Sequence, residues 1–156
     1  MHQYLICRIG RHLFALPSRH VKKATSVLPH LKIPLLKPFI LGLVFYNKQF
    51  IYKIALDSLL DLGLYKSFSE VTSDATLVLE INETMFCATV NDVNTIATIE
   101  HTKIKALSGL PENSNEFFPN KKYLSGYFEQ GKNDIYIINL SEVHHSCFQN
   151  NLETGI

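Results

Sequence analysis

Apolar and polar residues alternate with a period of two along much of the chain, and this pattern predicts half-buried β-strands. The run Tyr4–Ile9 is rich in β-forming residues, Gly10–Arg11 interrupts it, and His12–Leu16 resumes it. Two such runs around a tight turn predict a hairpin. After the strand-breaking proline that follows, Ser18 is placed to cap a short helical turn through Val21–Ala24.

A second hairpin is predicted within residues 39–56. Its first half is apolar on both faces, as in a fully buried strand, the polar pair Asn47–Lys48 interrupts the run, and Phe50–Ile54 resumes it. The segment Asp57–Leu62 then carries leucines at roughly helical spacing before Gly63, which favours the end of a short helix there.

The second half of the chain repeats the hairpin pattern. Thr76–Ile81 and Met85–Val90 alternate around the turn Asn82–Glu83, and Asp92–Ile99 continues with β-branched residues. The remaining predicted elements are a closing hairpin, two polar loops and a polar tail, at Tyr123–Phe128 with Ile135–Leu140, residues 65–75 with Ser108–Asn120, and Ser146–Ile156. About eight to ten short strands with little helix and no βαβ alternation indicate an all-β sandwich or barrel.

The composition fits a folded domain and argues against nucleic-acid binding. Hydrophobic residues make up 46% of the 156 residues and charged residues 19%, which is enough apolar surface for a core. Lys and Arg number 15 against 14 Asp and Glu, so the net charge of +1 gives no field to hold a phosphate backbone. The chain also has no Trp on which bases could stack.

Cysteine usage and hydropathy indicate a cytoplasmic protein. The three cysteines are Cys7, Cys87 and Cys147, an odd and widely spaced set that does not form a disulfide framework. Cys7 and Cys87 lie in apolar runs, where a thiol behaves as a small hydrophobe, and a reducing compartment suits them. The N-terminal residues lack the apolar core of a signal peptide, and the most apolar stretch, Pro38–Tyr46, is about half the length of a membrane span. We therefore expect no direct membrane insertion.

One group of residues near the C-terminus has the chemistry of metal ligands. His144, His145 and Cys147 offer imidazole and thiol groups. Adjacent residues on a strand point in opposite directions, however, and no second cluster has ligand spacing. Exposed tail histidines are the expected reading, and no metal is expected.

Two further combinations contain residue types that occur in catalytic sites. Cys7 or Cys87 with His12 has the types of a nucleophile and its base, but no acidic residue or glycine-rich loop accompanies them, so core packing is expected. Asp57 and Asp61 lie four residues apart on the short helix, where surface charges are the ordinary reading and Asp57 is placed to cap the helix start. We expect neither an enzyme nor a cofactor.

The ordered series of these elements resembles the CheW-like domains of bacterial chemotaxis. It begins with YLICRIGRHLFALPSRHV at residues 4–21, continues through Gly42, which opens GLVFYNKQFIYKIAL, and reaches the short helix DSLLDLG at residues 57–63. The second half supplies TLVLEI, then MFCATVNDVNTI at residues 85–96, and YLSGYFEQGKNDIYIINL at residues 123–140. Each motif alone is weak, and the order and spacing over nearly the whole chain carry the resemblance.

The resemblance implies two packed SH3-like five-stranded β-barrels within a single domain at residues 1–145. The first subdomain would cover roughly residues 12–75 and the second roughly residues 76–135, with the terminal strands completing the barrels. Residues 146–156 would form a flexible tail.

The resemblance also implies a non-catalytic adaptor that couples a chemoreceptor to a histidine kinase through protein contacts. Its partners would be the regulatory domain of the kinase and the cytoplasmic tip of the receptor. The candidate partner-binding residues cluster around the hairpin of residues 39–56 and the turn before it: Val21, Val27, Ile40, Leu43, Phe45, Tyr46, Asn47 and Lys48. Tyr46 is favoured over Phe45 as a contact because its ring is amphipathic.

The chain departs from the family at the hairpin tip, where Asn-Leu-Arg-Gly is common and Phe45, Tyr46, Asn47 and Lys48 stand here, and at Lys23, where a Glu is frequent. Joint replacement of an Arg–Glu pair leaves no buried charge behind. Two alternatives stay open: a divergent scaffold of a pilus or surface-motility pathway, and a small β-barrel that binds a ligand or an oligonucleotide. Edge strands could also pair two copies into a homodimer.

Overall fold

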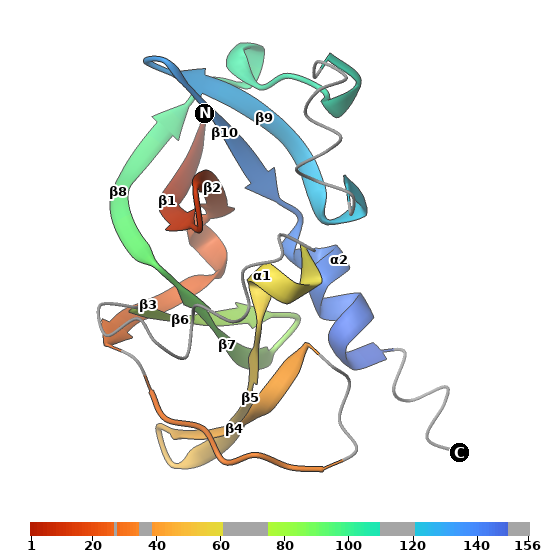
Figure 1. The fold of residues 1–156 in the computed structure, drawn as a ribbon. Coiled ribbons are helices and arrows are strands. Elements are labelled where there is room, and N and C mark those ends of the chain that lie inside the picture. The colour runs from red at the N-terminus through yellow and green to blue at the C-terminus, as the bar shows by residue number, and fades with distance from the viewer. Residues whose placement is uncertain (27, 35–38, 61–74, 110–120, 150–156) are drawn as a thin grey trace.

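The computed structural model describes residues 1–26, 28–34, 39–60, 75–109 and 121–149. The described residues form ten strands in two five-stranded sheets, with short helical segments at the junctions (Figure 1). In chain order the strands and helices are β1 (His2–Ile9), β2 (His12–Pro17), η1 (Ser18–His20), β3 (Val21–Ser26), β4 (Ile40–Tyr46), β5 (Gln49–Ile54), α1 (Leu56–Leu59), β6 (Ala75–Ile81), β7 (Thr84–Val90), β8 (Asp92–Ile99), η2 (His101–Lys103), η3 (Leu107–Gly109), η5 (Lys121–Tyr123), β9 (Leu124–Gln130), β10 (Asn133–Ile138), α2 (Leu140–His144) and the π-helical turn η6 (His145–Gln149).

Strands β1, β2 and β8–β10 form one sheet, and the intervening strands β3–β7 form the other. Sheet A has the strand order β8-β1-β2-β10-β9, and sheet B has the order β3-β6-β7-β5-β4. Sheet B therefore takes residues 21–90, whereas sheet A combines residues 2–17 with residues 92–138. This division differs from the expected boundary between residues 75 and 76. Parallel pairing of β7 with β5, and of β10 with β2, joins strands distant in sequence, and such pairing leaves no local signal.

Each sheet curls around a small core of its own, as expected for two barrels. The core of sheet A draws on all five of its strands, at Tyr4, Ile6, Ala15, Ala97, Phe128, Ile135 and Ile137. The core of sheet B consists of Val44, Ile51, Val78 and Cys87, with Tyr46 and Met85 packed against it. Because residues two apart on a strand share a face, the alternate residues of the same strands face the other way.

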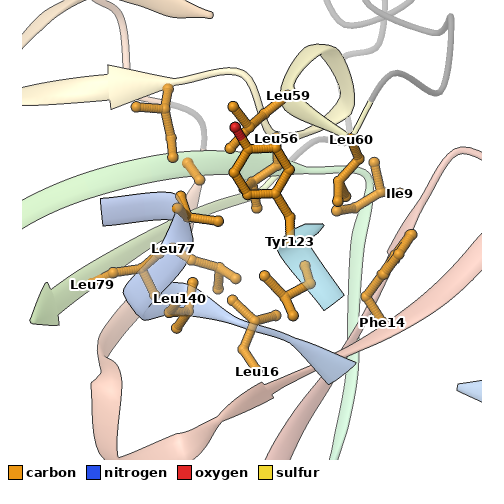
Figure 2. Packing of buried hydrophobic residues seen from close by; sticks show 14 of the residues in the cluster. Ile9, Phe14, Leu16, Leu56, Leu59, Leu60, Leu77, Leu79, Tyr123 and Leu140 are labelled. Carbon is orange, nitrogen blue, oxygen red and sulfur yellow. The ribbon is translucent and has the colours of Figure 1, made fainter. Parts of the chain in front are cut away.

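Those alternate residues build a larger core between the two sheets. It holds Phe14 and Leu16 from β2, Leu77 and Leu79 from β6, and Leu140 from α2 (Figure 2). The leucines of α1 enter the same cluster, which explains their roughly helical spacing in the sequence. The two barrels are therefore fused through a continuous apolar layer.

All four predicted hairpins are present with short turns. Asn47 and Lys48, at φ values of 49° and 67°, occupy the turn of β4 and β5, and Asn82 and Glu83 repeat this geometry between β6 and β7. Positive φ at both central residues is the type I′ pattern that matches the twist of a hairpin. The turn between β9 and β10 uses Gly131 with a φ of 65°.

The structure corrects two local predictions. Val21–Ser26 is a strand, and only Ser18–His20 forms a helical turn, whose N-cap is Pro17. The predicted tail also begins too early, because residues 145–149 continue α2 as a π-helical turn in which Cys147 is fully buried. Residues 150–156 lie outside the described residues, as does most of the two predicted loops and the end of the predicted helix after Leu60.

The helices among the described residues are all too short or too polar to cross a membrane.

Candidate partner-binding surface

The β4–β5 hairpin carries an unusual pair of exposed aromatic rings. Phe45 lies directly opposite Phe50 across the two strands, and their side chains are 63% and 62% exposed. The ring centroids are 5.1 Å apart and the ring planes meet at 61° in an edge-to-face contact. Since exposed large aromatic groups cost free energy in water, this pair is a candidate contact surface.

Three further apolar side chains extend this pair along the same face of the sheet. Leu43 lies two residues before Phe45 and opposite Tyr52, so the four side chains share one face. Leu31 joins them from outside the hairpin, because it pairs with Leu43 through reciprocal backbone hydrogen bonds of 2.8 and 2.9 Å. We call Leu31, Leu43, Phe45, Phe50 and Tyr52 the aromatic face.

The aromatic face ends where the C-terminal turn begins. The ring of Tyr52 packs against that of Phe148 in η6, with centroids 5.7 Å apart, and Phe148 packs in turn against the buried Phe86 of β7 at 5.3 Å. Tyr52 keeps 37% of its surface exposed. The aromatic face is therefore the solvent-exposed continuation of the core between the two sheets.

Leu31 belongs to a short strap, residues 28–31, that meets the edge strand β4 at Leu43 and is held at its other end by Leu28. The Leu28 N–H donates to Thr76 Oγ1 at 3.1 Å, and the Leu28 carbonyl accepts a hydrogen bond of 2.8 Å from the Lys53 ammonium. Lys53 lies on β5 and is only 4% exposed. At Gly42, a Cβ atom would overlap the Leu31 carbonyl, so glycine is needed for the strap to approach the strand.

The predicted contact residues on the β4–β5 hairpin differ in their exposure. Phe45, Asn47 and Lys48 are exposed, and Leu43 is half-buried on the aromatic face. Tyr46 is half-buried and packs against the core of sheet B, so strand alternation turns Phe45 rather than Tyr46 outward. The aromatic rings of Phe50 and Tyr52, which the sequence did not single out, complete the surface.

The other predicted contact residues do not join this surface. Ile40 is 6% exposed and belongs to the core between the sheets. Val21 is half-buried against the same core on β3, which is the opposite edge strand of sheet B from β4. Val27 lies outside the described residues.

The thiols considered as nucleophiles are embedded in the fold. Burial raises the pKa of Cys7 to about 12, and burial, opposed by the nearby charge of Lys53, raises the pKa of Cys87 to about 11. Both side chains are fully buried, and burial lowers the pKa of His12. A thiol that stays protonated at neutral pH and has no access to solvent is a packing group.

The polar groups near the C-terminus are also more buried than predicted. His144 is 5% exposed, and its ring packs near those of Phe86 and Phe148, whereas the neighbouring His145 is exposed.

The acidic residue considered on the short helix is buried as well. Asp57 is fully buried within α1, where Ala55 is the N-cap, so Asp57 is neither a surface charge nor the cap. Among the described residues, no group of three His, Cys, Asp or Glu side chains is placed to hold a metal ion.

The comparisons with known proteins agree with this architecture. A family model described as a CheW-like domain matches residues 3–146. Among solved structures, the chain is similar to the crystal structure of the scaffolding protein TtCheW from Thermoanaerobacter tengcongensis, with 17% sequence identity and a TM-score of 0.76. That match covers 89% of this chain and 84% of the other chain. No curated protein sequence matches the chain.

Proposed function

This chain belongs to the CheW-like domain family, and from that membership we propose that it is a non-catalytic, cytoplasmic adaptor of chemotaxis-type signalling. It would couple a chemoreceptor to a histidine kinase by binding the kinase regulatory domain and the cytoplasmic tip of the receptor. The structural similarity to TtCheW, a scaffolding protein, supports this class of function. The observation that supports a particular contact surface is the exposed pair Phe45 and Phe50.

The aromatic face has the properties of an interface centre. It contains two large aromatic rings, a tyrosine and two leucines, and aromatic anchors supply much of the binding energy in protein interfaces. The hairpin that presents it, residues 40–54, contains Lys48 and Lys53 and no acidic residue. Because Lys48 is exposed at the tip, a partner with an apolar centre and an acidic margin fits this surface best.

Calorimetric titration against the regulatory domain of a chemotaxis kinase from the same organism tests this proposal. We expect saturable binding by the natural chain. Joint replacement Phe45→Ser and Phe50→Ser should weaken that binding about tenfold or more, since each ring is a candidate anchor. Ile96→Ser is the matched control, because Ile96 is 57% exposed but lies on β8 of the other sheet.

The result that contradicts the proposal is absence of binding to both the kinase domain and the receptor tip. Equal loss of affinity in the double variant and in the Ile96→Ser control would contradict the placement of the contact on the aromatic face. Far-ultraviolet circular dichroism of each variant separates a lost contact from a lost fold.

A further inference from the structure

Three of the four sheet edges are protected against pairing with another strand. The edge of β4 is covered at Leu43 by the bridge to Leu31, and the edge of β9 is covered at Tyr127 by a bridge to Lys105. The edge strand β3 carries the exposed Lys22 and a bulge in its pairing with β6. Covering segments, lysines and bulges are the devices by which natural sheets prevent edge-to-edge association.

The fourth edge, β8, has no lysine, and none of the described segments covers it. Within sheet A it pairs with β1, and no other described residue bridges to it. Its eight residues contain a single charge, at Asp92, and no proline. Ile96, on this strand, is 57% exposed, and β8 runs along the outside of sheet A (Figure 1).

A bulge limits the part of β8 that can pair regularly. The register with β1 passes from Thr95 opposite Ile6 to Val93 opposite Cys7, which leaves Asn94 without a direct partner. The regular stretch is therefore Thr95–Ile99, with the sequence TIATI. Its outer edge presents backbone N–H and C=O groups at alternate residues.

We propose that β8 is a homodimer interface, in which Thr95–Ile99 pairs in antiparallel fashion with the same stretch of a second copy. A two-fold axis at Ala97 places Ile96 opposite Thr98 of the second copy, and both residues are exposed in the single chain. In this register Thr95 lies opposite Ile99, so the paired stretch brings no charge against a like charge. Glu100, the next residue, falls opposite the neutral Asn94.

A second copy suits this edge better than a charged partner does. The stretch is uncharged and largely β-branched, and a two-fold axis at Ala97 sets each isoleucine opposite a threonine of the second copy. A five-residue ladder buries less surface than a standard stable interface. We therefore expect a weak dimer, with a dissociation constant of about 10 μM to 1 mM. This interface is on a different sheet from the aromatic face and does not depend on the proposed adaptor function.

Sedimentation velocity of the full chain between about 1 μM and about 1 mM measures this association. The natural chain should show a sedimentation coefficient that rises with concentration toward that of a dimer. Ile96→Lys should weaken the dimer about tenfold or more, because two like charges enter the paired edge. Phe45→Lys is the matched control, because it replaces a similarly exposed apolar side chain on the other sheet by lysine, and it should leave the dimer unchanged.

A disulfide test fixes the register. The double variant Ile96→Cys with Thr98→Cys should form covalent dimers on mild oxidation, whereas Lys132→Cys in the β9–β10 turn should not. The natural cysteines are all buried and contribute little to crosslinking.

Two sedimentation results would overturn the proposal. One is a chain that stays monomeric over the whole concentration range, and the other is a dimer that Phe45→Lys abolishes and Ile96→Lys leaves intact. Neither result bears on kinase binding, which is measured separately.

Discussion

Phe45 and Phe50 face each other across the β4–β5 hairpin, with ring centroids 5.1 Å apart in an edge-to-face contact, although each ring is more than half exposed. The turn residues Asn47 and Lys48, both at positive φ, fix the register that brings them together. The pair therefore holds two large aromatic groups in defined positions before any partner arrives. Such preorganisation reduces the ordering cost of binding.

The contact between these rings should be measurable in the isolated chain. A double-mutant cycle with Phe45→Ala and Phe50→Ala should give a coupling free energy of about 0.5–1 kcal/mol, as expected for a cross-strand aromatic pair. Urea denaturation of the four proteins measures it. A coupling of zero would mean that the rings are independent in solution.

Removal of the Lys53 ammonium should loosen the strap and lower stability. In Lys53→Met the stem keeps its packing, but the Leu28 carbonyl loses the donor at 2.8 Å. The free energy of unfolding should fall by about 1–3 kcal/mol, and amide exchange at Leu31 should speed up. Lys132→Met in an exposed turn is the control and should change neither quantity.

The buried thiols should make the protein less stable in alkali. The pKa of Cys7 rises from its ordinary value of 9.0 to about 12 in the folded chain, so above pH 9 the unfolded chain releases a proton that the folded chain retains. The free energy of unfolding should then fall with rising pH, by up to about 1.4 kcal/mol per pH unit for this thiol. Chemical denaturation between pH 8 and about pH 10.5 tests it, and Cys7→Ala should flatten the slope relative to the natural chain.

His144 should make the protein sensitive to acid. Burial, and then the charge of His145, lower the pKa of His144 below 6.5, and its ring lies near Phe86 and Phe148. As the pH falls through that range the unfolded chain binds a proton before the folded chain does, so stability is lost. Denaturation at pH 7 and about pH 5 should show a smaller loss in His144→Phe than in the natural chain. His145→Phe, at an exposed position, should keep most of the loss.

The C-terminal turn should be firmly attached to the fold. The Tyr123 hydroxyl donates to Ser146 Oγ at 3.0 Å in a buried position. Tyr123→Phe should lower the free energy of unfolding by about 0.5–1.5 kcal/mol, and hydrogen exchange at Ser146 and Cys147 should rise. Exchange at these amides as fast as in an unfolded peptide, already in the natural chain, would instead support the flexible tail that the sequence suggested.

Local pattern was sufficient for the four hairpins and for the general class of fold, but not for β3 or for the C-terminal turn. Alternation and turn residues located every hairpin, because a side-chain period of two and a turn that requires positive φ are both properties of neighbouring residues. The family also follows from the ordered spacing of these elements, which the match over residues 3–146 confirms.

Burial and surface position, in contrast, were decided by tertiary contacts. Whether Phe45 or Tyr46 faces solvent depends on which face of β4 meets the core of sheet B, and alternation alone allows either choice. The polar end of the chain looked free, yet His144 and Cys147 are buried because α2 and η6 cover the core between the sheets. The sequence by itself thus determined most of the strands, though not β3, because alternation and turn residues are local, while the pairing of strands distant in sequence determined which residues they bury and which they leave exposed.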